Sequence, residues 1–247
     1  MKSIFGKIAV VIVTLCLLSA CGGLQKSQNK TPPQPTRQLT DRNAQPTQPY
    51  PIRNVPDTDQ IFTKTEFILP IKETWYVFWG GTNKRDNYHY AYESQRYAID
   101  LVIRKNGKSY RGDKKQNQSY YAFGKEVIAP AKGTVIQVEN DVSDNKPVGK
   151  MNPDKPFGNY VMIDHGNDEY SVIGHLKKGS PVVNVGDTVE QGDLIGLCGN
   201  SGNSSEPHIH FQVSNSSMLN QGQSIRIRLR DNVNPTRGQY VQPATGI

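Results

Sequence analysis

Two histidines that are two residues apart carry the strongest chemical signal in this sequence. They lie in the segment Pro207-His208-Ile209-His210-Phe211. On a β-strand, residues two apart point to the same face, so His208 and His210 should project together while Ile209 faces the core. Two neighbouring imidazoles suit either two ligands of a zinc ion or one ligand beside one acid–base group. Alone, the pair is a weak signal, because two surface histidines often stand together by accident.

Two further side chains have the chemistry to join this pair. His175 follows the apolar run that ends at Gly174, and Asp100 lies in the segment Tyr97-Ala98-Ile99-Asp100-Leu101. There the odd-numbered residues can pack inward, while Asp100 shares the other face with the small Ala98. A carboxylate inside an apolar strand is costly to bury unless a cation meets it, and a metal ion would do so.

The order of the motifs between His89 and Ser214 resembles that of the lysostaphin/LytM-type zinc metalloendopeptidases, which cut peptide cross-links in bacterial peptidoglycan. The segment 158–166 (GNYVMIDHG) is similar to the central hairpin of that family, and 185–196 (VGDTVEQGDLIG) to its glycine-rich turn. The segment 199–211 (GNSGNSSEPHIHF) is similar to its closing histidine motif. The ordered set is much more specific than any one motif.

The resemblance implies one Zn²⁺ per chain, with Asp100 and His210 as ligands and with His175 and His208 as the catalytic pair that handles protons and the oxyanion. Most members place the third ligand four residues before the aspartate, where this chain has Arg96. A branch of the family has a longer loop before the Gln-Arg-Tyr-Ala-x-Asp segment, and its histidine corresponds to His89. We therefore expect His89 to be the third ligand. The alternatives are a degenerate site without zinc and, more remotely, Glu93 as a substitute ligand.

Such a site would hydrolyse peptide bonds. Two neutral imidazoles and one carboxylate leave zinc with one positive charge and an open coordination position. Water in that position has its pKa lowered to about 7, which supplies hydroxide near neutral pH. The two catalytic histidines could then relay its proton and stabilise the tetrahedral oxyanion.

The elements that must position these residues are predicted to be strands. Short apolar runs alternate with turn signals from Ile61 onward, and no segment shows convincing helical periodicity. The predicted class is all-β: an antiparallel sheet or sandwich of the LytM metallopeptidase type, with a small barrel-sandwich-like part and few or no helices. The expected strands cover 67–70, 75–79, 97–103, 133–139, 159–164, 171–176, 193–197 and 208–213. Residues 224–230 (SIRIRLR) alternate strictly, as an edge strand with a solvated arginine row or, alternatively, an anion-binding strip.

The first 58 residues predict an export signal and a tether. Residues 1–20 combine two lysines with an apolar run that is too short to cross a bilayer permanently, which is typical of a secretory signal. Leu18-Ser19-Ala20-Cys21 resembles the lipobox of bacterial lipoproteins, and this implies cleavage before Cys21 and lipidation of its sulfur. The alternative is an ordinary signal with a chance cysteine. Residues 21–58 are rich in proline and polar residues and should form a disordered tether. The catalytic domain would then span 59–247, with the motif core at 89–214.

Composition limits the classes of partner. The chain has 247 residues, 22 glycines, 16 prolines and a formal charge of +7, which suits an anionic partner such as the cell wall. With no basic helix, we expect no nucleic-acid binding. The expected partners are peptidoglycan, a membrane through the lipid on Cys21, and a regulatory protein that could relieve autoinhibition. We expect a monomer in the cell envelope, at the outer membrane, in the periplasm or on the extracellular face.

Two competing functions remain open at this point. The first is a zinc-free protein on the same fold that binds peptidoglycan or regulates a hydrolase. The second is a carrier or adaptor barrel, because residues 127–135 and 185–192 resemble the half-repeats of lipoyl and biotinyl domains. That reading gives the histidines no role, and no lysine at a hairpin tip occurs near residues 141–157 in the pattern of such carriers.

The remaining reactive or aromatic residues have structural interpretations. We expect His165 to make a structural hydrogen bond in a turn and Cys198 to be a buried small hydrophobe, although a thiol peptidase with His175 is the alternative. Trp75 and Trp79 should belong to the core. Tyr88, Tyr90 and Tyr92 either line a substrate groove or pack on a half-buried strand.

Overall fold

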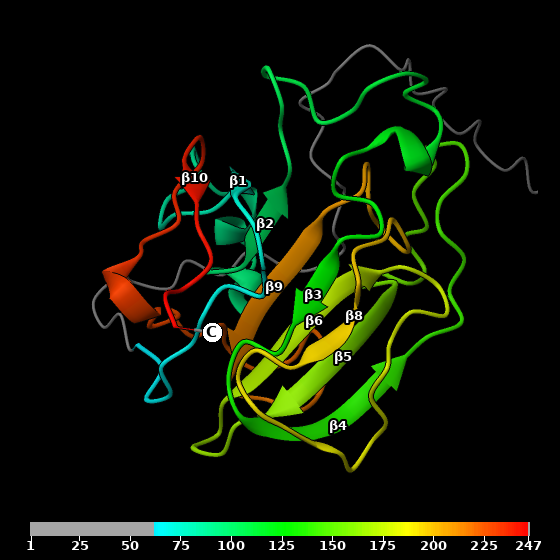
Figure 1. The fold of residues 1–247 in the computed structure, drawn as a ribbon. Coiled ribbons are helices and arrows are strands. Elements are labelled where there is room, and N and C mark those ends of the chain that lie inside the picture. Colours follow the sequence, from blue (N-terminus) through cyan, green and yellow to red (C-terminus); the bar gives the residue numbers. More distant parts are fainter. Residues whose placement is uncertain (1–61, 247) are drawn as a thin grey trace, which may run out of the picture. The chain divides into compact units, whose positions relative to one another are not determined.

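The structure is a computed structural model that describes residues 62–246 (Figure 1). The predicted signal peptide, the lipidation site Cys21 and the tether up to residue 58 lie outside the described residues. In the described range, no helix combines the length and apolarity that a membrane span requires.

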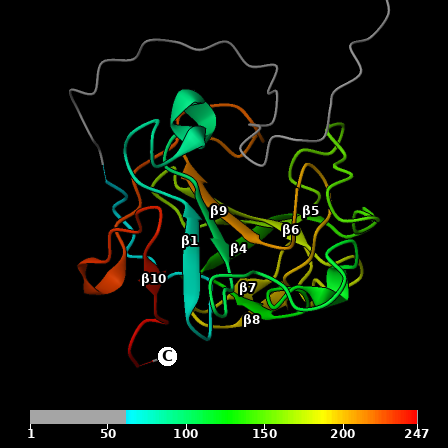
Figure 2. The same ribbon diagram turned by 90° about the horizontal axis from the view of Figure 1, so that it is seen from above.

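The fold is built on an antiparallel sheet of eight strands in the order β10-β1-β2-β9-β6-β5-β4-β7 (Figures 1 and 2). A second sheet pairs two strands, β3 with β8. The strands are β1 (Trp75–Trp79), β2 (Ile99–Val102), β3 (Glu126–Ile128), β4 (Gly133–Glu139), β5 (Asn159–Asp164), β6 (Tyr170–Leu176), β7 (Thr188–Val189), β8 (Leu194–Leu197), β9 (Ile209–Ser214) and β10 (Tyr240–Val241). The helices between residues 62 and 246 are short 3₁₀ turns: η1 (Tyr88–Ala91), η2 (Glu93–Gln95), η3 (Asn117–Ser119) and η4 (Arg230–Asn232). The all-β prediction is confirmed.

The large sheet has two faces of different character. One face packs against the β3–β8 sheet and forms the main core, to which β2 contributes Ile99 and Leu101 and β9 contributes Ile209 and Phe211. Because side chains alternate along a strand, Asp100 and His210 fall on the opposite face. A smaller apolar cluster of Phe157, Met162 and Val172 lies outside the main core. We call the face with Asp100 and His210 the site face.

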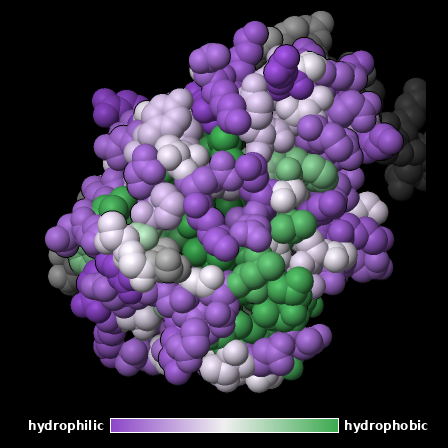
Figure 3. All heavy atoms as spheres, in the orientation of Figure 1, coloured by the Kyte–Doolittle hydropathy of each residue, from purple (hydrophilic) through white to green (hydrophobic). Residues whose placement is uncertain are grey.

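The surface in the orientation of Figure 3 is mostly hydrophilic, with apolar side chains gathered over the region of β3 and β8. Leu194 of β8 is one of the exposed large apolar residues and is 39% exposed. This outer side of the small sheet is the reverse of its core side, where Val127 and Ile195 are fully buried.

Most strand predictions agree with the structure, and β1, β4 and β5 have the predicted ends. Residues 67–70 and 224–230 are not continuous strands; they make isolated bridges, and two of these join Phe62 to Arg226 and Phe67 to Leu229 in parallel. The sequence pattern predicted strands there, but the two extended segments pair mainly with each other, and only at single residues.

This pairing also uses the arginine row. Arg226 lies 4.5 Å from the ring centre of Phe62, and Arg228 donates to the backbone oxygen of Lys64. Arg230 lies 3.6 Å from a carboxylate oxygen of Glu66. Since this strip is engaged by the protein's own residues, its arrangement does not support the anion-binding interpretation.

A buried carboxylate fixes the beginning of the described chain. Glu169, just before β6, is 2% exposed and accepts hydrogen bonds from the backbone N–H groups of Lys64 and Thr65, the latter at 2.9 Å. A carboxylate that accepts two backbone donors makes charge-assisted hydrogen bonds, which are stronger than neutral ones. The segment around residue 64 is thereby held at the β5–β6 turn.

Candidate metal centre

The pairing of β2 with β9 places Asp100 directly opposite His210. Both side chains are on the site face, both residues are 3% exposed, and His210 Nδ1 lies 3.0 Å from Asp100 Oδ1. Ile209 is fully buried in the core, as the alternation predicted. Two residues 110 positions apart in the sequence therefore meet because one strand pair is in this register.

His89 reaches the same carboxylate from the 3₁₀ turn η1. Its Nε2 lies 3.0 Å from Asp100 Oδ2. The turn is fixed by the fully buried Asn87, whose side chain accepts from His89 N at 3.1 Å and donates to the backbone oxygen of Ala98 at 2.9 Å. Arg96, which occupies the position of the usual family histidine, instead places its guanidinium 4.8 Å from the ring centre of Tyr90.

The residue set fits a zinc ion. One ligand atom each from His89, Asp100 and His210 lies within 4.8 Å of the others, and all three residues are buried. Atoms that bind one zinc at about 2.0–2.1 Å in a tetrahedral arrangement lie about 3.3 Å apart, close to the two 3.0 Å contacts with Asp100. Two imidazoles and one carboxylate are also a typical donor set for catalytic zinc.

Hydrogen bonds at the other ring nitrogen orient both imidazoles. His89 Nδ1 lies 3.1 Å from Gln95 Oε1, and His210 Nε2 lies 2.9 Å from Gln212 Oε1. An amide oxygen can only accept, so these ring nitrogens carry the protons. His89 Nε2 and His210 Nδ1 are then unprotonated in the neutral rings and face Asp100 with free lone pairs. Metal-binding histidines are commonly oriented in this way.

His208 and His175 lie beside this trio. His208 Nε2 is 3.8 Å from Asp100 Oδ2, and the rings of His175 and His208 have centres 4.6 Å apart. Their Nδ1 atoms contact backbone oxygens at 2.8 Å: Ser201 O for His175 and Glu206 O for His208. Carbonyl oxygens only accept, so both neutral rings carry the proton on Nδ1 and keep a lone pair on Nε2.

His175 reaches the site through an irregularity in β6. The β5–β6 register shifts between Asn159 and Val161, and His175 has a φ of 59°. In a regular strand, His175 would share a face with the core residue Ile173, two positions earlier. A bulge adds one residue to a strand and redirects its side chains, often next to active sites. A left-handed non-glycine residue is strained by about 1–3 kcal/mol, so the fold maintains this conformation against its intrinsic cost.

Burial and mutual charge control ionisation in this cluster. Burial lowers the pKa of His89 and His208 and lowers that of His175 far more, so these imidazoles favour the neutral form. For Asp100, burial raises the pKa, but the facing histidines, His89 first, outweigh it and hold the pKa well below its usual range. These directions favour the neutral forms of His89, His175 and His208, and a neutral imidazole is the form that binds a metal or accepts a proton.

Other predicted residues lie elsewhere or have different surroundings. His165 has both ring nitrogens in hydrogen bonds. Cys198 is fully buried, and burial raises the pKa of its thiol well above the usual range, so it lacks the thiolate of a thiol peptidase. Trp75 is in the core, whereas Trp79 is partly exposed and its ring lies 5.3 Å from that of Tyr88.

The tyrosine run adjoins the centre but is not a strand. Tyr88 and Tyr90 belong to η1, so the strand interpretation of this run is wrong. The ring of Tyr88 lies 4.0 Å from that of His89. Three tyrosines at alternate positions suggested a strand, but the local hydrogen bonds that Asn87 makes favour a 3₁₀ turn.

Sequence reasoning missed the polar residues that support the centre. Gln212 could have been found, because it lies two residues after His210 on the same strand face. Gln95 stands in the quoted Gln-Arg-Tyr-Ala-x-Asp segment, but no local signal shows that its side chain turns to His89. Ser201, whose backbone oxygen orients His175, lies in a loop and carried no signal.

The comparison with protein families bears directly on this centre. Residues 118–226 match the model of Peptidase family M23. We call residues 118–226, which match this model, the M23 segment. The matched range includes His175, His208 and His210, while His89 and Asp100 precede it. The M23 match and the cluster of ligand atoms are therefore separate observations that meet at His210.

Curated proteins with similar sequences include an uncharacterized metalloprotease and a peptidoglycan DD-endopeptidase. An uncharacterized metalloprotease of Haemophilus influenzae is 38% identical over 89 residues, which are 36% of this chain and 16% of that protein. The peptidoglycan DD-endopeptidase ShyA of Vibrio cholerae is 41% identical over 64 residues, which are 26% of this chain and 14% of that protein. The chain thus matches less than a fifth of the length of these two relatives.

Among solved structures, the peptidase lysostaphin from Staphylococcus simulans is 22% identical, with a TM-score of 0.36. That match covers 62% of this chain and 46% of the lysostaphin chain.

Proposed function

We propose that this protein is a zinc endopeptidase that hydrolyses peptide bonds in the stem peptides or cross-links of peptidoglycan. The observation that carries the proposal is the convergence of four imidazoles on Asp100. His89 and His210 contact its carboxylate oxygens at 3.0 Å, His208 lies 3.8 Å away, and His175 packs on His208. The M23 segment and its similarity to ShyA support peptidoglycan as the substrate.

In the proposed site, His89, Asp100 and His210 hold one zinc ion. When bound, zinc would supply a Lewis acid that lowers the pKa of a coordinated water to about 7 and polarises the carbonyl group of the substrate. The hydrogen bonds from Gln95 and Gln212 keep the two imidazoles in the tautomers that this role requires.

His175 and His208 act as the proton-transfer pair. Each neutral ring has its proton on Nδ1, held by a backbone oxygen, so Nε2 is a base. Such a base accepts a proton from the attacking water and returns it to the leaving amine. Only after it is protonated can Nε2 donate a hydrogen bond to the oxyanion, so proton uptake and oxyanion stabilisation are sequential for one ring. With two histidines, one ring can take the proton of the attacking water, while the other can donate to the oxyanion once it has taken up a proton from solvent.

The location of the enzyme follows from the sequence outside the described residues. We propose that residues 1–20 are removed, that Cys21 is lipidated, and that residues 21–58 tether the catalytic domain 59–247 to a membrane of the cell envelope. The basic charge of the chain suits an anionic cell wall. Mass spectrometry of membrane-extracted protein tests this: a peptide that begins at an acylated Cys21 supports the anchor, and an unmodified Cys21 contradicts it.

The function is tested by metal analysis and digestion of purified peptidoglycan. We expect about one zinc per chain, cleaved muropeptide cross-links, and loss of cleavage after treatment with a chelator. His165→Gln is a matched control, because it removes a histidine outside the cluster and should retain both zinc and cleavage. A chain that binds no zinc and cleaves nothing would instead be the non-catalytic peptidoglycan binder or hydrolase regulator on this fold.

A further inference from the structure

Arg104 lies on the site face, beyond the end of β2. Ile99, Leu101 and Ile103 all belong to the core, so the alternate residues Asp100, Val102 and Arg104 point to the opposite face. Four residues of extended chain span about 13 Å. Arg104 is therefore a cation on the same face as the metal centre, within reach of the residues that flank a bound substrate's cleaved bond.

Two aromatic rings hold the guanidinium of Arg104 in place. Its Cζ lies 4.0 Å from the ring centre of Tyr76 and 5.7 Å from that of Phe78, two residues on the site face of β1. Its Nε is buried and has no hydrogen-bond partner. No ion pair of Arg104 within 4.0 Å occurs in the structure between residues 62 and 246. A buried donor without a partner is unfavourable, and the protein's own residues leave this one unsatisfied.

The loop that carries His208 is the neighbour of Arg104. The positive charge of Arg104 acts on the carboxyl group of Glu206, which accepts a hydrogen bond from Ser109 Oγ at 3.0 Å. The backbone oxygen of Glu206 is the one that orients His208. Arg104 is therefore on the His208 side of the metal centre.

We propose that Arg104 is a specificity-determining residue that binds a free carboxylate of the peptide substrate. This inference rests on the proposed function, since it needs a substrate that lies across the site face. A guanidinium has five donors in a planar fork that matches a carboxylate, and stacking on Tyr76 presents this fork with little loss of side-chain freedom. The distance along the strand places the carboxylate within about four residues of the cleaved bond.

The test uses two kinds of substrate. One is a cross-linked peptide of peptidoglycan that has free carboxylates, and the other is the same peptide with these carboxylates converted, one at a time, to carboxamides. For one carboxylate, we expect the wild-type protein to lose about 10- to 100-fold in kcat/KM on amidation, mainly through KM. Arg104→Gln should cleave the carboxylate peptide as poorly as the amidated one and should leave cleavage of the amidated one unchanged. Arg104→Lys, which keeps the charge but not the fork, should fall between them.

Arg111→Gln is the matched control, because it removes the same charge from an exposed arginine seven residues further along. It should discriminate between the two peptides as the wild type does. If Arg104→Gln lowers kcat/KM equally for both peptides, or for neither, Arg104 does not bind a carboxylate. A lower thermal midpoint together with equal losses would assign it a structural role.

Binding of both peptides, measured by calorimetry on zinc-loaded protein, separates this inference from the proposed function. Carboxylate-dependent binding that Arg104→Gln abolishes, without any cleavage, would support the carboxylate site while the endopeptidase function fails. Cleavage without a preference for the carboxylate, or binding that is equal for both peptides, would overturn the carboxylate site.

Discussion

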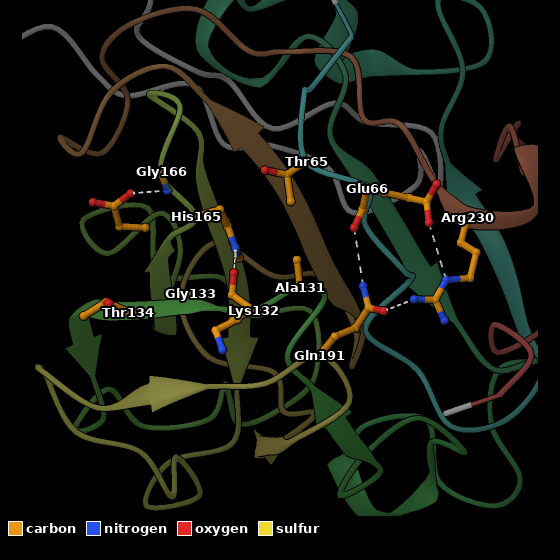
Figure 4. Close-up of a pocket in the computed structure, with 11 residues that line it drawn as sticks. Thr65, Glu66, Ala131, Lys132, Gly133, Thr134, His165, Gly166, Gln191 and Arg230 are labelled. Atoms are coloured by element: carbon orange, nitrogen blue, oxygen red, sulfur yellow. Dashed lines mark hydrogen bonds and ion pairs between the residues drawn. The ribbon is translucent and has the colours of Figure 1, made fainter.

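The histidines occupy two regions of the molecule, the metal centre on the site face and a hollow around His165 (Figure 4). In the centre, each of four imidazoles has one ring nitrogen in a hydrogen bond to a backbone or amide oxygen. The other ring nitrogen is left for the cluster around Asp100. His165 uses both nitrogens within the protein: Nδ1 lies 2.8 Å from Lys132 O and Nε2 lies 2.7 Å from Ser171 Oγ.

The hollow around His165 is the second of these regions. It has a volume of about 570 Å³, and three side chains of its lining, Glu66, Gln191 and Arg230, lie in one network. Arg230 donates to Gln191 and lies 3.6 Å from Glu66, and Gln191 donates in turn to the backbone oxygen of Glu66 at 3.4 Å (Figure 4). The lining residue Lys132 pairs with Glu190, which lies outside the lining.

The contrast shows which property marks a functional histidine here. Burial lowers the pKa of His165 just as it lowers that of His175, so a shifted pKa does not separate the two regions. A free lone pair on a ring nitrogen does separate the two regions, because a ring with a free lone pair can bind a metal or accept a proton. We therefore expect substitutions in the two regions to have different consequences.

The largest effect should follow the loss of a ligand. His210→Ala and His89→Ala should lose zinc and reduce cleavage by about 10⁴-fold or more, because the Lewis acid is worth several kcal/mol to the transition state. Zinc content by mass spectrometry and initial rates on muropeptides measure this. Full zinc occupancy in His89→Ala would move the third ligand elsewhere.

His208→Ala should keep zinc and lose turnover by about 10²- to 10⁴-fold, the usual contribution of a general acid–base group. The readout is kcat at full zinc occupancy. Equal zinc loss in His208→Ala and His210→Ala would contradict the division into ligands and proton-transfer residues.

A smaller effect is expected for the residues that orient the ligands. Gln212→Ala removes the acceptor for His210 Nε2, and such losses typically weaken metal binding by about 10- to 100-fold. Competition with a fluorescent chelator measures the affinity. Gln223→Ala is a suitable control, because Gln223 is exposed and binds Glu93 rather than a ligand.

His165→Gln should affect stability alone. The loss of two hydrogen bonds in a partly buried site should cost about 1–3 kcal/mol of unfolding free energy, while zinc binding and cleavage stay unchanged. Urea unfolding of zinc-loaded protein measures this. A loss of activity in a folded, zinc-loaded variant would mean that the hollow takes part in function.

The stability of the metal-free protein should depend on pH. The folded-state pKa of His89, His165, His175 and His208 is lower than the unfolded value of about 6.5. The unfolded chain therefore takes up protons first, so stability is fully present above pH 6.5 and decreases as the pH falls towards the folded values. Each such histidine contributes a slope of at most about 1.4 kcal/mol per pH unit. Urea midpoints between pH 7.5 and 5.5 should fall, and a flat profile would contradict these directions.

The sequence predicted the framework of the site well, because alternation is a local property. Strands such as β4 and β5 show it clearly, and it also placed His208 and His210 on one side of a chain whose Ile209 is in the core. The choice of His89 came from a family resemblance, because nothing in the spacing of an isolated histidine shows that Asn87 will turn it towards β2.

The features that the sequence did not reveal depend on distant contacts. The bulge that turns His175 to the site face depends on pairing with β5, and its left-handed conformation is unusual for histidine. The two extended segments near Phe67 and Leu229 bridge one another across more than 150 residues, so each looked like an ordinary strand when considered alone.

The clasp that Glu169 makes on Lys64 and Thr65 has a mechanical consequence. Glu169 and His175 flank opposite ends of β6, about 20 Å apart along the strand. A load pulled through the residues before Phe62 would first meet the pairing of Phe62 and Thr63 with Arg226 and then these hydrogen bonds, at the end of the strand away from the imidazoles. If residues 21–58 tether the domain as proposed, tension on the tether would reach the protein away from its cluster of imidazoles.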